Sequence, residues 1–183
     1  MTFRTRDFTP VPPHARPRRS RRAVRVIVTD GASVLVWVDT DPGLPGSRWY
    51  VTPGGGIDPG ESSVDAAVRE LWEETGLRVA ASDLSGPVMR RVVVHGYSDQ
   101  ILDQSEEFYV LRTPRFTPDI AGHTPDEQLT LQGHVWLAFD DLEDADAPVW
   151  PEVLADVVAL ASQPDAWPWD LGVVEESSVP VGV

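Results

Sequence analysis

Three glutamates, Glu70, Glu73 and Glu74, are spaced three and four positions apart in a stretch with helical periodicity. At 3.6 residues per turn, this spacing places their carboxylates on one side of a helix. Such close carboxylates repel one another unless a cation neutralises them, and hard oxygen ligands suit Mg²⁺ or Mn²⁺. Arg69, four positions before Glu73, can pair with a carboxylate and hold it in position. The spacing indicates a divalent-metal site, with an ordinary solvated acidic face as the alternative.

A glycine-rich loop precedes these glutamates. Gly54, Gly55 and Gly56 allow close approach of the backbone, and the segment 59–61 (Pro-Gly-Glu) directs the chain into the helix. The carbonyl of Gly54 or Gly55 can then join the metal ligands. The loop favours the metal site over the solvated acidic face.

Loop and helix together resemble the Nudix box. The intervals between the matching groups are five, seven, one and one residues, and no position departs from the pattern over 23 of the 183 residues. The matching positions are Gly55, Glu61, Arg69, Glu70, Leu71, Glu73, Glu74, Gly76 and Leu77. The resemblance implies a Nudix hydrolase, a metal-dependent enzyme that cuts a diphosphate linkage in a nucleoside diphosphate derivative.

The resemblance also implies a role for each polar residue of the box. Glu70, Glu73 and Glu74 are expected to bind the divalent ion or ions. Arg69 is expected to orient the glutamates, and Glu61 to brace the loop on the helix. The metal would neutralise and position the diphosphate and lower the pKa of a water that attacks one phosphorus.

A general base is needed as well. Nudix enzymes place it in the box, where Glu70 or Glu73 would serve, or on a later strand or loop. The candidates outside the box are Glu106, Glu107 and Glu127. Glu107 begins an expected strand and could point back at the metal, although an exposed charge at a strand end is the alternative for each of the three.

The substrate is less well defined by the sequence. ADP-ribose hydrolases place a proline, and dinucleoside polyphosphate hydrolases a tyrosine, at a position after the box that corresponds here to residues 92–95. Residues 92–95 contain neither, Tyr97 falls slightly late, and the coenzyme A signature is missing. The leading hypothesis is hydrolysis of a nucleoside triphosphate or related nucleotide. The alternatives are a non-catalytic Nudix-fold module that senses a nucleotide, and a nucleic-acid-binding protein that uses the arginine-rich start.

Composition limits the other classes of function. A chain of 183 residues with 42% apolar residues and no cysteine predicts one domain whose metal ligands are oxygen or imidazole. No run of 18 apolar residues exists, so a cytoplasmic protein without membrane contact is expected. The first 25 residues hold eight arginines and one acid, and the rest carries seven arginines against 28 acids. This acidic body opposes stable nucleic-acid binding, and a homodimer is possible.

The elements that position the box follow from hydrophobic periodicity and turn residues. We expect a flexible Arg/Pro-rich arm over 1–21, a Nudix hydrolase domain over 22–163 and a C-terminal tail over 164–183. Strands are expected at 23–29, 33–38, 49–51, 88–95, 107–112 and 134–139, and helices at 63–75 and 152–161. This order predicts an α/β (α+β) fold with helices on a mixed sheet, and the resemblance implies the Nudix αβα sandwich.

Overall fold

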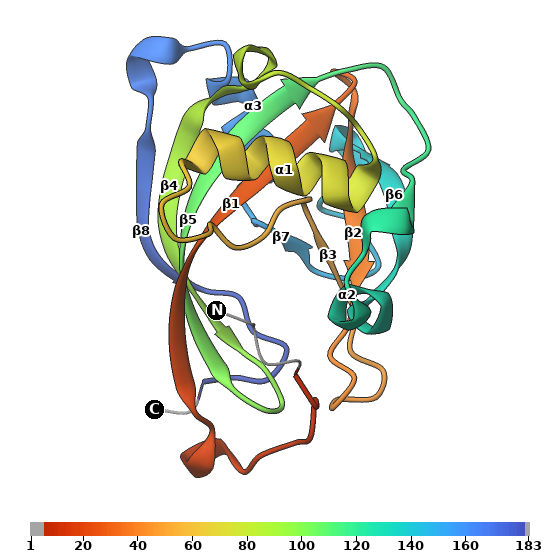
Figure 1. Cartoon of the computed structure of the whole chain (residues 1–183), viewed down its shortest axis with the longest axis vertical. Coiled ribbons are helices and arrows are strands. Elements are labelled where there is room, and N and C mark those ends of the chain that lie inside the picture. The colour runs from red at the N-terminus through yellow and green to blue at the C-terminus, as the bar shows by residue number, and fades with distance from the viewer. Residues whose placement is uncertain (1–5, 182–183) are drawn as a thin grey trace.

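The computed structural model describes residues 6–181, in which eight strands form one curled, mixed sheet (Figure 1). The strands are β1 (Arg18–Thr29), β2 (Ser33–Asp39), β3 (Trp49–Val51), β4 (Ser85–Gly96), β5 (Ile101–Arg112), β6 (Leu131–Ala138), β7 (Val149–Trp150) and β8 (Trp169–Glu175). Their order is β7-β3-β2-β1-β5-β4-β8, and β6 pairs with β2. The α-helices are α1 (Ser63–Thr75), α2 (Pro125–Thr130) and α3 (Leu154–Leu160).

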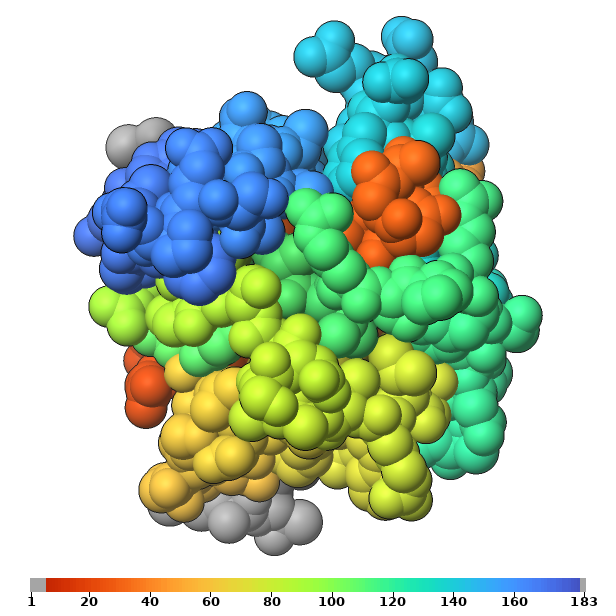
Figure 2. All heavy atoms as spheres, turned by 90° about the horizontal axis from the view of Figure 1, so that it is seen from above, coloured from red at the N-terminus to blue at the C-terminus, as the bar shows by residue number. Residues whose placement is uncertain are grey.

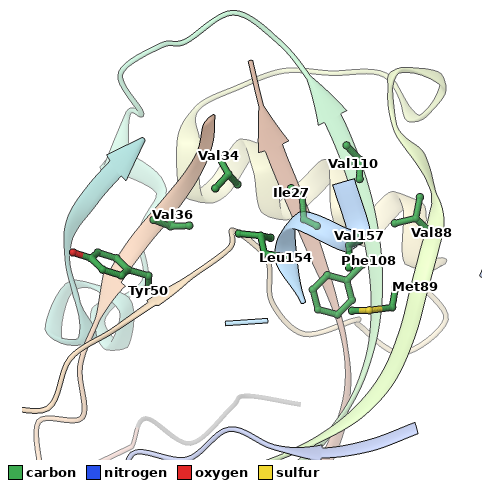
Figure 3. Packing of buried hydrophobic residues seen from close by; sticks show 10 residues of the cluster. All are labelled: Ile27, Val34, Val36, Tyr50, Val88, Met89, Phe108, Val110, Leu154 and Val157. Carbon is green, nitrogen blue, oxygen red and sulfur yellow. The ribbon is translucent and has the colours of Figure 1, made fainter. Parts of the chain in front are cut away.

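Strand β1 lies at the centre of the sheet, and from Ala23 to Thr29 its side chains are mostly buried on both faces. Val24, Val26 and Val28 face α1, whereas Ile27 faces the cluster that contains Leu154 of α3. Figure 3 shows this second cluster, in which α3 packs beside β1, β4 and β5. Successive side chains of a strand point to opposite faces, so a continuous apolar run predicts a strand covered on both sides. Seen from above, α1, the strands and the C-terminal residues form successive layers (Figure 2).

Strands β1 and β2 diverge after a short pairing at Thr29 and Val34. The glycine-rich loop enters the space that opens between them, because the backbone N–H of Val24 donates to Gly55 O (2.9 Å) and that of Val26 to Pro53 O (2.8 Å). The loop is therefore held by β1 as a further strand would be. It reaches the sheet directly before the chain turns into α1.

Helix α1 begins and ends where the sequence predicts. Ser62 caps its N-terminus by accepting a hydrogen bond from the Asp65 backbone N–H, and Gly76 ends it with φ 70°. All the strands that the sequence predicts are present, and the second expected helix corresponds to α3. The mixed sheet with helices on both faces agrees with the expected fold class. None of the helices in residues 6–181 is long and apolar enough to cross a membrane.

Two strands extend beyond residues 22–163, where the domain is expected. Strand β1 starts at Arg18, inside the expected arm, and pairs with β5 over its whole length. Strand β8 lies inside the expected tail and pairs with β4. Polar and arginine-rich segments can form strands because main-chain hydrogen bonds hold them, and Arg18 also pairs with Asp103 (2.6 Å). The expected flexible arm and tail also include residues 1–5 and 182–183, which lie outside the described residues.

Candidate metal centre

Glu74 is a buried carboxylate that is held from two sides. Its Oε2 accepts a hydrogen bond from Trp37 Nε1 on β2 and another from the Gly54 backbone N–H, both at 3.0 Å. Burial, with repulsion from Glu70, raises its pKa well above the ordinary value. The Glu74 side chain therefore fixes the last turn of α1 to both the sheet and the glycine loop.

Glu70, one turn earlier on α1, lies against the same loop. Arg69 Nη1 donates to its Oε1 (2.7 Å), and burial raises its pKa although Arg69 opposes the shift. A Cβ at position 55 would lie 2.6 Å from both carboxylate oxygens, closer than non-bonded atoms allow. Only glycine therefore fits at Gly55 without displacing Glu70.

Glu127 joins these two glutamates from outside the box. Ligand oxygens of Glu70, Glu74 and Glu127 all lie within 4.8 Å of one another. In residues 6–181 this is the only such group of three or more acidic, histidine or cysteine side chains. Three like charges, two of them buried, are unstable without a cation, and hard carboxylate oxygens suit Mg²⁺ or Mn²⁺. The residues present therefore fit a divalent ion.

Helix α2 presents Glu127 and was not expected from the periodicity. Thr124 caps the helix, and the Glu127 carboxylate accepts a hydrogen bond from the Thr124 N–H (2.7 Å). A threonine followed three residues later by a glutamate, with Pro125 at the first helical position, is a sequence signature of a helix start. That signal could have identified α2, which is too short for its periodicity to show.

Arg69 organises the polar end of the loop. Its guanidinium donates to both carboxylate oxygens of Glu61 (2.9 Å each) and to the Gly56 carbonyl (2.8 Å). Nη1 also contacts Glu70 and Glu73 at 2.7 and 3.1 Å. Arg69 therefore links the glutamates of α1 to Glu61 and to the loop.

Glu73 lies apart from the other two box glutamates. Its side chain is 39% exposed, contacts Arg69, and is not in the group of three acids. Successive helix positions differ by about 100° around the axis, so Glu73 and Glu74 diverge despite being neighbours. Glu70 and Glu74 in turn share the buried side of α1 with Leu71.

The candidate bases on β5 are engaged elsewhere. Glu107 pairs with Arg90 (2.9 Å), and Glu106 pairs with Arg25 and Arg91. Burial opposes ionisation of Glu106, but the two arginines outweigh it and lower the pKa to about 2. Neither glutamate belongs to the group around Glu70, so Glu127 is the only outside candidate that the structure brings there.

The two glycine carbonyls expected near the metal also accept hydrogen bonds. Gly54 O accepts from Arg25 Nη1 (3.2 Å), and Gly55 O from the Val24 N–H (2.9 Å). A carbonyl oxygen has two lone pairs, so each retains capacity for a second partner. A metal bond to either carbonyl stays a prediction.

Comparison with known proteins gives one consistent family. The sequence model of the NUDIX domain matches residues 19–157. The chain is 28% identical over 160 residues to the RNA pyrophosphohydrolase of Mesorhizobium japonicum, an alignment that covers 78% of this chain and 90% of that protein. It is 31% identical over 100 residues to the RNA pyrophosphohydrolase of Psychrobacter cryohalolentis, covering 50% and 56%. A putative 8-oxo-dGTP diphosphatase of Bacillus subtilis is 44% identical over 66 residues, covering 34% and 44%.

Two solved structures share the fold at low sequence identity. The MutT protein from Bacillus halodurans superposes with a TM-score of 0.55 and 18% identity, covering 86% of this chain and 90% of that one. A NUDIX hydrolase from Nitrosomonas europaea gives a TM-score of 0.53 and 17% identity, covering 81% and 93%. These likenesses concern the fold alone.

Proposed function

Because the NUDIX domain match over residues 19–157 shows that this chain belongs to the Nudix hydrolase family, we propose that it is a metal-dependent nucleotide hydrolase. Its proposed reaction is hydrolysis of the diphosphate linkage of a nucleoside triphosphate or a related nucleotide, with Mg²⁺ or Mn²⁺ as cofactor. The observation that carries the proposal is the grouping of Glu70, Glu74 and Glu127. These three carboxylates would hold the ion. When bound, a divalent ion supplies positive charge to the diphosphate and makes an attacking water more acidic.

The other polar residues of the site position these carboxylates or move a proton. Arg69 holds Glu70 and Glu73 at 2.7 and 3.1 Å, and so sets where both lie. Glu73, partly exposed and outside the group of three, is the box glutamate best placed to accept a proton from water. Glu107 pairs with Arg90 on β4 and, unlike Glu73, shares no arginine with Glu70, which disfavours Glu107 for this role.

The substrate class is proposed from charge and from the named relatives. The relatives are named for RNA pyrophosphohydrolase and 8-oxo-dGTP diphosphatase activities, both of which act on nucleotide phosphates. A net charge of −14 repels a long phosphate backbone, which favours a free nucleotide over an RNA. A non-catalytic nucleotide sensor is disfavoured because all the box glutamates are present.

The test is a panel of nucleoside triphosphates, oxidised nucleotides, nucleoside diphosphate derivatives and a 5′-triphosphorylated RNA. Each would be incubated with Mg²⁺ or Mn²⁺, and the products identified by mass. Glu74→Gln and Glu127→Gln should lower turnover by about 100-fold or more, because each removes a charged ligand. Glu143→Gln, at an exposed loop position, is the control. Absence of turnover across the panel, or full activity in both variants, would contradict the proposal.

A further inference from the structure

The segment after β8 begins with a buried carboxylate, far along the chain from the box. Glu176 is 4% exposed, and its two oxygens accept hydrogen bonds from Arg91 Nη1 (2.6 Å) and Nη2 (2.7 Å). The neighbouring Glu175 is exposed. Arg91 lies on β4, so this bidentate pair binds the C-terminal segment to the sheet.

The remaining donor of the Arg91 fork continues the contact toward β1. Arg91 Nε donates to Glu106 Oε2 (2.7 Å), and Arg25 Nε donates to Glu106 Oε1 (2.9 Å). Glu106 is thus shared by two arginines, one on each neighbouring strand. With Glu176, the cluster contains two positive and two negative side chains and is balanced in charge.

Arg25 joins this cluster to the glycine loop. Its Nη1 donates to the carbonyls of Thr52 and Gly54, each at 3.2 Å. The Gly54 N–H in turn donates to Glu74 Oε2 at 3.0 Å. A continuous path of hydrogen bonds therefore runs from Glu176, through Arg91, Glu106, Arg25 and Gly54, to Glu74.

Resting on the function proposed above, we propose that Glu176 is a positioning residue of the metal centre, which acts through Arg91, Glu106 and Arg25 on the loop that holds Glu74. The physical reason is charge balance. Without the Glu176 carboxylate, the buried Arg91 has only Glu106 as a charged partner and competes for it with Arg25. Removing one member of a buried ion pair leaves an uncompensated charge, and Arg25 is the group that contacts the loop. Glu176 lies beyond the residues that match the NUDIX domain.

Glu176→Gln and Glu175→Gln form a matched pair of test variants, because each removes one negative charge from adjacent positions. Mn²⁺ binding to the full chain would be measured by calorimetry. Glu176→Gln should weaken binding about 10-fold, as expected when a partner of a metal ligand is lost. Glu175→Gln, whose carboxylate accepts one hydrogen bond from the Val181 N–H, should bind as the wild type does.

A second readout needs no metal. In NMR spectra of the metal-free protein, the Gly54 amide and the Trp37 indole N–H report on the Glu74 carboxylate that both contact. Both resonances should shift in Glu176→Gln and stay in place in Glu175→Gln. Unchanged resonances together with wild-type Mn²⁺ binding in Glu176→Gln would overturn the inference. If the wild type itself bound no Mn²⁺, the proposed function would fail, while the resonances would still test the path.

A double variant tests the charge balance. It can also be measured if Glu176→Gln alone does not fold. Arg91→Met with Glu176→Gln removes one charge of each sign and leaves Glu106 paired with Arg25 alone. We expect this protein to fold and to bind Mn²⁺ within about 3-fold of wild type, since double substitutions of paired buried groups are far less harmful than single ones. Binding weakened about 10-fold in the double variant would show that charge balance does not explain the effect.

Discussion

At the residue scale, the three box glutamates of α1 lie in two different environments. Glu70 and Glu74 are buried against the glycine loop, whereas Glu73 is partly exposed and pairs with Arg69. Burial of a carboxylate disfavours its charged form, so the two buried groups destabilise the metal-free fold at neutral pH. The same burial places their oxygens close enough to Glu127 to share one cation. A site that suits a cation is therefore a site that is strained without it.

This strain predicts that Glu74→Gln stabilises the metal-free protein at neutral pH while it abolishes activity. The folded-state pKa of Glu74 is raised, so the wild type pays a penalty above that pKa and regains stability as the pH falls through it. A glutamine oxygen can still accept the hydrogen bonds of Trp37 and Gly54. Thermal unfolding with chelator should give a higher midpoint for the variant at pH 8, and the difference should shrink toward pH 4. Glu73→Gln, at a partly exposed position, should change the midpoint little.

At the element scale, the glycine loop packs against α1 and holds the glutamates in position. Its three glycines have different surroundings. Gly54 has φ 139°, and a Cβ there would lie 2.2 Å from Val24 O on β1. Gly55 faces Glu70, whereas a Cβ at Gly56 would meet nothing within 4 Å. The loop therefore requires glycine at Gly54 for its fit to the strand and at Gly55 for the position of a carboxylate.

Gly55→Ala and Gly56→Ala should separate these roles. The added methyl group at position 55 would meet the Glu70 carboxylate at 2.6 Å, and because this is the end of a side chain, the carboxylate can move while the fold survives. Turnover and Mg²⁺ affinity should fall about 10-fold or more in Gly55→Ala. Gly56→Ala should keep both within about 3-fold, consistent with open space at that position. Equal activity in the two variants would show that Glu70 is not held by the loop.

At the scale of the whole molecule, the C-terminal segment completes both the sheet and the charge cluster. Strand β8 pairs in parallel with β4, and Glu176 neutralises Arg91. The N-terminal residues are likewise part of the sheet, since β1 pairs with β5 from Arg18 onward. The sheet therefore extends at both ends beyond residues 22–163.

Truncation after Gln163 should destabilise the fold strongly. It removes β8, exposes the edge of β4, and leaves the buried Arg91 without Glu176. Breaking a buried ion pair by removing one partner costs about 3–5 kcal/mol, to which the lost pairing adds. Urea unfolding should show a much lower midpoint for the truncated chain. The control is the chain ending at Val181, which retains every described contact. Equal midpoints for these two chains would contradict the integration of the C-terminal segment.

The sequence by itself determined the local features. The extent of α1 from Ser63 to Thr75 follows from its cap, its periodicity and Gly76, because these act between residues within a turn of one another. The spacing of the box also predicted that Arg69 can pair with a glutamate of the same helix, since these side chains lie within one turn of one another. The apolar run over 23–29 predicted a strand, and β1 contains it.

Only the tertiary structure decided which distant groups meet. Glu127 joins Glu70 and Glu74 from a short helix, whereas Glu107, the outside candidate that the sequence favoured, pairs with Arg90. Sequence periodicity reports which side of an element is buried, but not which element covers it. The first residues of β1 and the whole of β8 were not expected, for a related reason: main-chain pairing depends on a neighbouring strand, and polar side chains do not reveal that neighbour. The glutamates of α1 are thus placed by local sequence, whereas the approach of Glu127 to them depends on the fold.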